Sequence, residues 1–254
     1  MGSPRTGRIY VFAHGLLGFS QLRLGWKKIA YFRGLPEALH ELGYAASFAR
    51  TPPTREIARR AQALHRHIQG LERGEIVLIG HSMGGLDCRH LATHLDESHR
   101  IRAVVTVGSP HRGSPLAVRA LTSPWALCRI ARAIARPALA DLTPAACARF
   151  NEQTPDREDV RYISYAGARP VEELPRILRY WSRLIQEREG DNDCMVSVSS
   201  ARWGEFREVL RADHYELAGW SLAPADPAIQ RPFDHFGFYR ALLNELDALE
   251  FEPP

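Results

Sequence analysis

A serine set among glycines, in the segment Gly80–Gly85 with the sequence GHSMGG, is the feature of this chain best suited to covalent chemistry. The segment fits G-x-S-x-G, a pattern that holds a serine on a sharp turn between a strand and a helix and exposes its hydroxyl. An apolar run, Glu75–Gly80, leads into it, and a helical pattern continues to Leu95. A glycine and serine turn without function would be the alternative, but this setting favours Ser82 as a nucleophile.

A serine nucleophile needs a base, which in this type of site is a histidine near the C-terminal end of the chain. Of the 11 histidines, only His214 and His235 lie beyond the last apolar runs. His214 directly follows the run Phe206–Leu210, so it would occupy a loop at the carboxyl end of a strand. His235 opens a terminal helix, where we expect packing or capping. The sequence therefore favours His214 as the base.

Two aspartates, Asp191 and Asp193, lie in a turn between the serine and this histidine and are candidates for the acid. The acid must accept a hydrogen bond from the histidine Nδ1, so that Nε2 is free to take the serine proton. Aspartates in turns often only fix the conformation of their own turn. We take Asp193 as the acid and keep Asp191 as the alternative.

Two backbone amides are candidates for an oxyanion hole, which binds the negative charge of an acyl-transfer intermediate. One is the amide of Met83, which follows the nucleophile. The other belongs to Leu16, in the glycine-rich loop His14–Gly18 after the first apolar run. We expect His14 and His81 to hold this loop and the serine turn by hydrogen bonds.

Short apolar runs separated by helical patterns must position these groups. Most runs are apolar on both sides, which predicts strands of a mostly parallel sheet buried on both faces. The runs are 8–13, 44–49, 75–80, 101–107, 160–166 and 206–210. The clearest helical pattern, 57–68, has Thr54 as a cap and Gly70 at its end. This alternation predicts one α/β domain over residues 1–254, with reactive loops at the carboxyl ends of the strands.

The interval 114–155 departs from this alternation. It has no strand-like run, contains several prolines and predicts short helices inserted between two strands. Within it, Leu127, Ile130 and Ile134 recur on one helical face, against arginines on the other. Such an amphipathic helix suits a lipid interface, and it suits ordinary packing equally well.

The composition is that of an ordinary globular protein, with 254 residues of which 45% are hydrophobic and 24% charged. Arginine is dispersed and the net charge is only +4, so we expect no nucleic-acid partner. The four cysteines lack metal-binding spacing, which predicts free thiols. No apolar stretch has the length of a transmembrane helix and no signal peptide is visible, so we expect a cytoplasmic protein.

Taken together, these motifs resemble those of the bacterial triacylglycerol lipases, which belong to the α/β-hydrolase superfamily. The matching segments, in chain order, are His14–Gly18, Gly80–Gly85, Val107–Ser114, Asn192–Val196 and Asp213–Glu216. The resemblance implies an α/β-hydrolase fold, with a mostly parallel central sheet of about six strands flanked by helices. It also implies that the insertion 114–155 is a helical lid.

Carried over position by position, the resemblance implies a catalytic triad of Ser82, Asp193 and His214. It thereby selects between the two aspartates that the local sequence left open. It further implies that the amides of Leu16 and Met83 donate to the oxyanion.

The chain departs from this family in several respects, and its cysteines do not fall where the secreted members have their disulfide. The family usually has glycine after the catalytic aspartate, where this chain has Cys194. Secreted members also bind a structural calcium near the histidine loop, through carboxylates that correspond roughly to Glu173 and Glu216. At these positions this chain has glutamate in place of aspartate. Calcium needs several hard oxygen ligands, whereas two glutamates in such positions are more often surface charges. The chemistry itself requires no cofactor.

The sequence thus predicts hydrolysis of carboxylic esters with hydrophobic acyl groups, through an acyl-enzyme, with a lipid or ester as the substrate and transient contact between lid and lipid. One alternative is the same site acting on a thioester, a short-chain ester or a polyester. Another is a lipid-binding protein without activity that keeps a hydrolase scaffold. The presence of nucleophile, base, acid and donors together argues against the binder.

Overall fold

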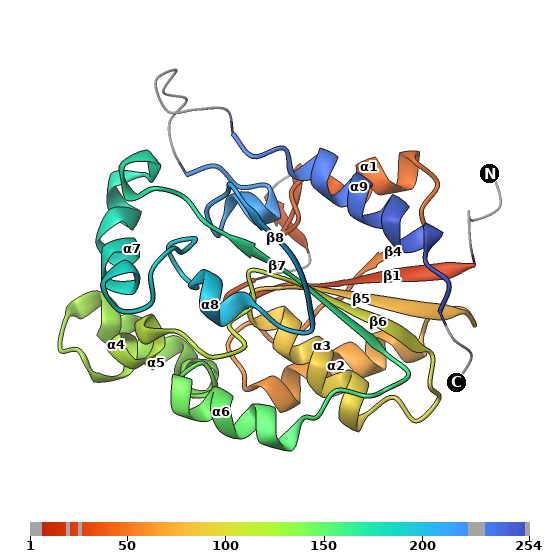
Figure 1. Cartoon of the computed structure of the whole chain (residues 1–254), viewed down its shortest axis with the longest axis horizontal. Helices are drawn as coiled ribbons and strands as arrows, with labels where there is room; N and C mark the ends of the chain where they lie inside the picture. Colours follow the sequence, from red (N-terminus) through yellow and green to blue (C-terminus); the bar gives the residue numbers. More distant parts are fainter. Residues whose placement is uncertain (1–6, 19–20, 25–26, 223–231, 252–254) are drawn as a thin grey trace.

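A six-stranded sheet, with neighbouring strands all parallel, runs through the part of the chain that the computed structural model describes, residues 7–18, 21–24, 27–222 and 232–251 (Figure 1). The strand order is β4-β1-β5-β6-β7-β8. The strands are β1 (Arg8–Ala13), β4 (Ala46–Phe48), β5 (Glu75–His81), β6 (Ile101–Val107), β7 (Arg161–Gly167) and β8 (Glu205–Leu210). Each of the expected apolar runs forms one of these strands, although β4 is shorter than its run.

Helices cover both faces of the sheet, α1 and α9 on one face and α2 and α3 on the other (Figure 1). A further group, α4 to α8, gathers on the left of this view. The helices are α1 (Leu35–Glu41), α2 (Ile57–Gln69), α3 (Met83–His94), α4 (Pro115–Thr122), α5 (Ala126–Asp141), α6 (Pro144–Gln153), α7 (Arg176–Glu189), α8 (Val198–Ala201) and α9 (His235–Ala248). Within the described ranges, none of the helices has the length and apolar character needed to cross a bilayer.

Strand β5 shows why the sheet is buried on both sides. Its residues from Ile76 to Ile79 are all fully buried. Val77 and Ile79 pack in one core cluster with residues of α1 and α9, whereas Ile76 and Leu78 pack in a second cluster with α2 and α3. Each such burial contributes about 1.5–3 kcal/mol, so the alternation of side chains fixes the central strand between two cores. The carboxyl end of β5 is thereby fixed in place.

Two local features differ from what the sequence predicted. Thr54 does not cap α2, because the amide of Ile57 donates instead to the Asp141 carboxylate, at 2.8 Å, from the end of α5. Gly70 ends α2 as expected. A two-stranded antiparallel sheet, β2 (Gln21–Leu24) and β3 (Lys27–Ala30), was not foreseen.

The interval 114–155 contains α4, α5 and α6, and the sequence had predicted short helices there. Helix α5 bends at Ala135, whose φ of −130° is not helical, two residues before Pro137. A proline inside a helix removes a hydrogen bond and clashes with the preceding turn, which accounts for the bend. Arg132 of α5 donates to the carbonyl of Leu121 at 2.8 Å and so ties α5 to the end of α4.

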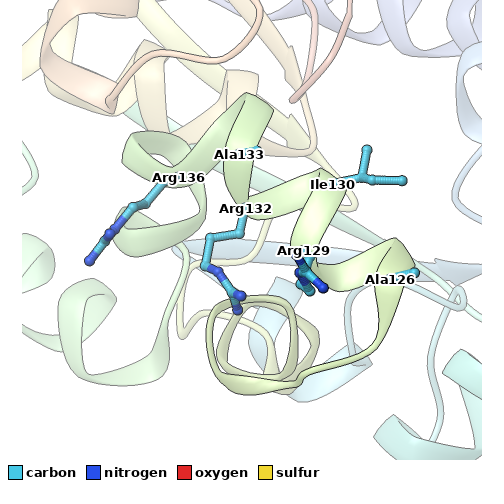
Figure 2. A pocket seen from close by; sticks show the side chains of 6 residues that line it. All are labelled: Ala126, Arg129, Ile130, Arg132, Ala133 and Arg136. Carbon is cyan, nitrogen blue, oxygen red and sulfur yellow. The ribbon is translucent and has the colours of Figure 1, made fainter.

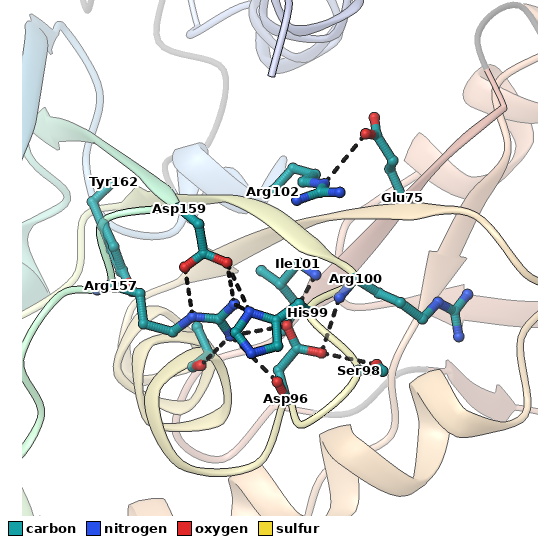
Figure 3. A network of polar contacts seen from close by, with 11 residues as sticks. Glu75, Asp96, Ser98, His99, Arg100, Ile101, Arg102, Arg157, Asp159 and Tyr162 are labelled. Atoms are coloured by element: carbon teal, nitrogen blue, oxygen red, sulfur yellow. Dashed lines mark hydrogen bonds and ion pairs between the residues drawn. The ribbon is translucent and has the colours of Figure 1, made fainter. Parts of the chain in front are cut away.

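A network of polar contacts around the buried Asp96 joins the loops before β6 and β7 (Figure 3). These loops lie at the amino ends of the strands, whereas the serine turn follows the carboxyl end of β5. Arg157 donates to Asp96 at 3.0 Å and to Asp159 at 2.9 Å. Oδ2 of Asp96, which accepts from Arg157, also accepts from the Ile101 amide at 3.1 Å, and Oδ1 accepts from the Arg100 amide at 3.2 Å. One carboxylate therefore fixes the entry of β6 and its link to the chain before β7.

We expect Asp96→Ala to lower the free energy of unfolding by about 3 kcal/mol, because it removes an acceptor shared by Arg157 and the Ile101 amide. Urea unfolding followed by circular dichroism measures the change. Glu97→Ala, at the exposed neighbouring position, is the control and should cost under about 0.5 kcal/mol. Equal effects of the two substitutions would contradict this role for Asp96.

Candidate active site

Ser82 lies at the turn between β5 and α3 with φ 55° and ψ −131°. A residue with a side chain rarely adopts this conformation, which costs on the order of 1–3 kcal/mol. The turn is held by hydrogen bonds from the Ser82 amide to the Val107 carbonyl and from the Gly85 amide to the Ser82 carbonyl, both at 3.0 Å. The strain therefore persists because neighbouring backbone fixes both sides of the serine.

The glycines around Ser82 permit contacts that a side chain would prevent. A Cβ at Gly80 would collide with the backbone of Gly85, and a Cβ at Gly84 would lie 2.8 Å from the His14 carbonyl oxygen. Helix α3 can thus approach both β5 and the loop after β1. The spacing of glycines in the motif is a packing requirement of the turn.

The structure brings together the three side chains that the sequence pattern selected. His214, in the loop after β8, places Nε2 at 2.9 Å from Ser82 Oγ. Its Nδ1 lies 2.7 Å from Oδ2 of Asp193, in the loop after α7. Asp193 is fully buried and His214 nearly so. A hydroxyl, an imidazole and a carboxylate are therefore joined in one hydrogen-bonded chain, as proton transfer from the serine requires.

The remaining oxygen of Asp193 is also satisfied. Oδ1 accepts from the amides of Met195 and Val196, at 2.9 and 2.7 Å, and the backbone carbonyl of Asp193 accepts from the His214 amide at 2.8 Å. Two backbone amides thus orient this carboxylate toward the imidazole, and the backbone of Asp193 is tied directly to that of His214. The alternative acid, Asp191, is exposed, and its backbone carbonyl accepts from Val198.

The other downstream histidine is not part of this chain of hydrogen bonds. His235, at the start of α9, is 2.9 Å from the backbone carbonyl of Arg33. Asp234 caps α9 by accepting from the Gly237 amide. His235 thus makes the structural contact that the sequence indicated.

Two glycines that the sequence analysis did not assign to the site make room for Asp193 and His214. A Cβ at Gly108, after β6, would lie 3.0 Å from Asp193 Oδ2 and 3.6 Å from His214 Nδ1. A Cβ at Gly167, at the end of β7, would lie 3.0 Å from the Asp193 Cβ. Their position at strand ends was the available signal, because reactive loops cross there.

The loop after β1 lies directly against the serine. A Cβ at Gly15 would be 2.7 Å from the Ser82 Cβ and 3.2 Å from its Oγ. Leu16 follows, and Leu17 adopts a positive φ of 57° while its amide donates to the Pro53 carbonyl at 2.8 Å. Met83 is the first residue of α3 and is fully buried. Gly15, the residue before Leu16, thus lies against Ser82, and Met83 directly follows Ser82 in the chain.

A fully buried ion pair, which the sequence did not reveal, contacts the loop after β1. Arg60 of α2 donates to Asp87 of α3 at 2.8 Å and to the backbone carbonyl of His14 at 2.5 Å. Burial raises the pKa of Asp87 to about 6, and the positive charge of Arg60 opposes that rise. The pair connects the helix that carries the serine to the loop that carries Leu16.

His14 makes the supporting contacts that were expected of it, whereas the hydrogen bond of His81 goes to Tyr31. His14 Nδ1 is 2.9 Å from the Gly15 carbonyl, and its Nε2 is 3.2 Å from the hydroxyl of Thr51. Burial, helped by the nearby Arg60 charge, lowers the pKa of His14 to about 4. His14 is therefore neutral near pH 7 and keeps a ring nitrogen available as an acceptor.

Tyr31 is a further neighbour of the site that the sequence analysis missed. Its hydroxyl is 2.8 Å from Nδ1 of His81, whose ring centroid lies 4.6 Å from that of His214. Burial raises the pKa of Tyr31 to about 12 and, with the His214 charge, lowers the pKa of His81 well below its usual range. A neutral phenol and a neutral imidazole thus pack behind His214.

Glu173 and Glu216, the two carboxylates considered for calcium, do not fit a calcium site. Both pair with the guanidinium of Arg169, Glu173 at 3.1 Å and Glu216 at 2.7 Å. A divalent cation bound by these carboxylates would lie beside a buried positive charge, which Coulomb repulsion disfavours.

Comparison with known proteins identifies a family and several relatives of this chain. A family profile described as "Domain of unknown function (DUF7379)" matches residues 1–148, more than half of the sequence. The chain belongs to this family. Triacylglycerol lipase 2 of Saccharomyces cerevisiae is 30% identical to this DUF7379 chain over 206 residues, which are 76% of the chain and 63% of the yeast protein. The chain thus spans less than two thirds of the length of that relative.

Solved esterases and lipases share the fold of this DUF7379 chain. A metagenomic carboxyl esterase matches with a TM-score of 0.81 and 25% identity, over 97% of this chain and 77% of that protein. The mature form of lipase BlEst2 from Bacillus licheniformis matches with a TM-score of 0.74 and 23% identity, over 96% and 94%. The predicted α/β-hydrolase fold and the resemblance to lipases of this type are therefore confirmed.

The lowered pKa of His14 predicts a loss of stability in acid. The unfolded chain takes up a proton near pH 6.5 and the folded chain only near 4, so this contribution is complete above 6.5 and is lost as the pH falls toward 4. Between about pH 7.5 and 5, the loss due to His14 is about 2 kcal/mol. Urea unfolding at both pH values measures the change. Between these values, the free energy of unfolding of His14→Asn should fall by about 2 kcal/mol less than that of the unmodified protein. An unchanged dependence would contradict the buried neutral state.

Proposed function

We propose that this protein hydrolyses carboxylic esters with hydrophobic acyl groups, through an acyl-enzyme formed on Ser82. The observation that carries the proposal is the unbroken chain of hydrogen bonds from Ser82 Oγ through His214 to Asp193. The names of the yeast relative, a triacylglycerol lipase, and of the metagenomic carboxyl esterase support the same class of reaction.

In the proposed first step, Ser82 Oγ attacks the ester carbonyl carbon while His214 Nε2 takes the hydroxyl proton. Asp193 stabilises the imidazolium and holds the ring orientation without taking a proton itself. The amides of Leu16 and Met83 would donate to the oxyanion of the tetrahedral intermediate, a contribution typically of about 3 kcal/mol for each donor. The intermediate collapses when His214 returns its proton to the departing alcohol.

The second step releases the acid. Water attacks the acyl-enzyme carbonyl, and His214 now takes a proton from this water, again with Asp193 as its partner. Collapse of the second tetrahedral intermediate breaks the bond to Ser82, which recovers its proton from His214. The products are a carboxylic acid and an alcohol, and no cofactor takes part in either step.

The preference for hydrophobic acyl groups is supported by the surface of the insertion 114–155. Leu127, Ile130 and Ile134 of α5 are 61%, 56% and 56% exposed. Figure 2 shows Ile130 pointing away from the side of α5 on which Arg132 lies. Exposed apolar groups on one face of a helix, with cationic groups on another, suit contact with a lipid surface. The insertion would thus act as a lid that meets lipid.

We expect Ser82→Ala to reduce the hydrolysis of p-nitrophenyl esters by about 10⁴-fold or more, because it removes the group that forms the acyl-enzyme. A fluorophosphonate probe should label the unmodified protein at Ser82 and leave the variant unlabelled. Ser98→Ala, an exposed serine outside the site, is the control for both assays. The Tm of the Ser82 variant should stay within about 3 °C.

Two results would overturn the proposal. Unchanged turnover by a folded Ser82→Ala variant would exclude this nucleophile, and an unreactive Ser82 in the unmodified protein would favour a lipid binder. Rates measured against acyl chain length separate the related substrates, since activity confined to acetyl esters or to thioesters would remove the lipase assignment.

The lid surface generates a separate prediction. The double variant Leu127→Ser and Ile130→Ser should lower activity on emulsified tributyrin by about tenfold, since apolar contact with the droplet is lost. Hydrolysis of soluble p-nitrophenyl butyrate should change less than about twofold. Leu42→Ser, which alters a comparably exposed leucine after α1, is the control. Equal losses on both substrates would show that α5 does not meet the lipid surface.

A further inference from the structure

Arg169 lies two residues after β7 with a nearly buried side chain, 4% exposed. Its Nε and Nη2 donate to the two carboxylate oxygens of Glu216, at 2.7 and 3.0 Å. Its Nη1 donates to Glu173 at 3.1 Å. Paired, parallel hydrogen bonds between guanidinium and carboxylate are strong and directional. The side chain is therefore a fixed cation between two glutamates.

The contact with Glu216 reaches the loop that carries the base. Oε2 of Glu216, which accepts from Arg169, also accepts from the Asp213 amide at 2.9 Å. The Asp213 carboxylate in turn accepts from the amides of Tyr215 and Glu216, both at 2.9 Å. The residues directly before and after His214 in the chain therefore have backbone amides held by the carboxylates of Glu216 and Asp213.

The backbone of Arg169 reaches the loop that carries the acid. Its amide donates to the carbonyl of Asn192 at 3.1 Å, and Asn192 directly precedes Asp193. The side chain of Asn192 is itself held, because it accepts from Ser182 at 2.9 Å and from the Cys194 amide at 2.9 Å. Arg169 therefore contacts, through its main chain and its side chain, the two loops that must meet at the site.

The charges around Arg169 explain why a cation is needed there. Glu173, Glu216 and Asp213 bring three carboxylates close together, and Glu216 and Asp213 are nearly buried. Arg211 also pairs with Glu173, but its side chain is 57% exposed. A buried carboxylate without a partner is costly, so the guanidinium of Arg169 is the positive charge that allows this cluster to remain folded.

We propose that Arg169 is a built-in cation that aligns the His214 and Asp193 loops and takes the place of a structural calcium ion. Arg169 is a positioning residue, since it does not touch the reacting atoms, and the catalytic part of this inference rests on the proposed function. The folded protein would then be independent of calcium. A guanidinium is always charged and cannot be removed by a chelator, so the alignment would be permanent.

The first test measures Tm with EDTA and with about 5 mM calcium chloride. The expected result is a difference below about 1 °C, because no ion binds the folded state selectively. A loss of several degrees in EDTA, restored by calcium, would overturn the proposal. This measurement does not depend on any activity, so it stands even if Ser82 proves unreactive.

The second test uses Arg169→Gln, which removes the charge. We expect kcat to fall by about tenfold or more with little change in KM, because the base and acid are displaced while substrate contacts remain. The acid limb of the kcat/KM profile should move to higher pH, since uncompensated carboxylates then stabilise a protonated His214. Labelling of Ser82 by a fluorophosphonate should slow in parallel.

Arg161→Gln is the matched control, because Arg161 makes the same two-bond contact with Glu205, at 2.9 and 2.7 Å, at the start of β7. It should leave kcat and the pH profile unchanged. Arg169→Lys keeps the charge and loses the paired contact, so its labelling rate should lie between those of the unmodified protein and the glutamine variant. If Arg169→Gln does not fold, a slowed Arg169→Lys still supports the proposal. Labelling of either folded variant at the unmodified rate would overturn it.

Discussion

The positive φ of Ser82 persists only while its surroundings leave no relaxed alternative. The cost, on the order of 1–3 kcal/mol, is met by fixing the backbone on both sides of the turn. The β5 strand before it is buried in two cores, and α3 after it packs on the loop after β1 through Gly84. Because the same contacts fix the loop after β1 beside Ser82, the strained conformation of the serine and the position of that loop depend on each other.

Three loops meet at the candidate site, and two buried arginines contact them. Arg60, paired with Asp87, donates to the loop after β1, and Arg169 contacts the loops that carry Asp193 and His214. Both arginines are buried and both donate to backbone or to carboxylates that orient backbone. Removing one partner of a buried ion pair leaves an uncompensated charge, so each of these arginines and its carboxylate partners depend on one another.

Local patterns and chain order predicted most of the strands and pointed to Ser82 and His214, whereas the choice of Asp193 over Asp191 needed the resemblance to a family. The sequence could not predict that Asp141 replaces Thr54 at the start of α2, or that Arg60 reaches His14. These contacts join residues far apart in the sequence, and an arginine that will be buried has no local signature. The glycines Gly108 and Gly167 were missed for the same reason, since what they make room for arrives later in the chain.

Cys194 shows how a departure from a family pattern can be absorbed. It adopts a φ of 76°, a conformation that favours glycine and costs a larger residue on the order of 1 kcal/mol. Its side chain is fully buried against Leu174 and Leu178, which offsets a cost of that size. Burial, followed by the nearby Asp193 charge, raises the pKa of the thiol well above its usual range. The thiol therefore stays protonated beside Asp193 and packs as a small apolar group.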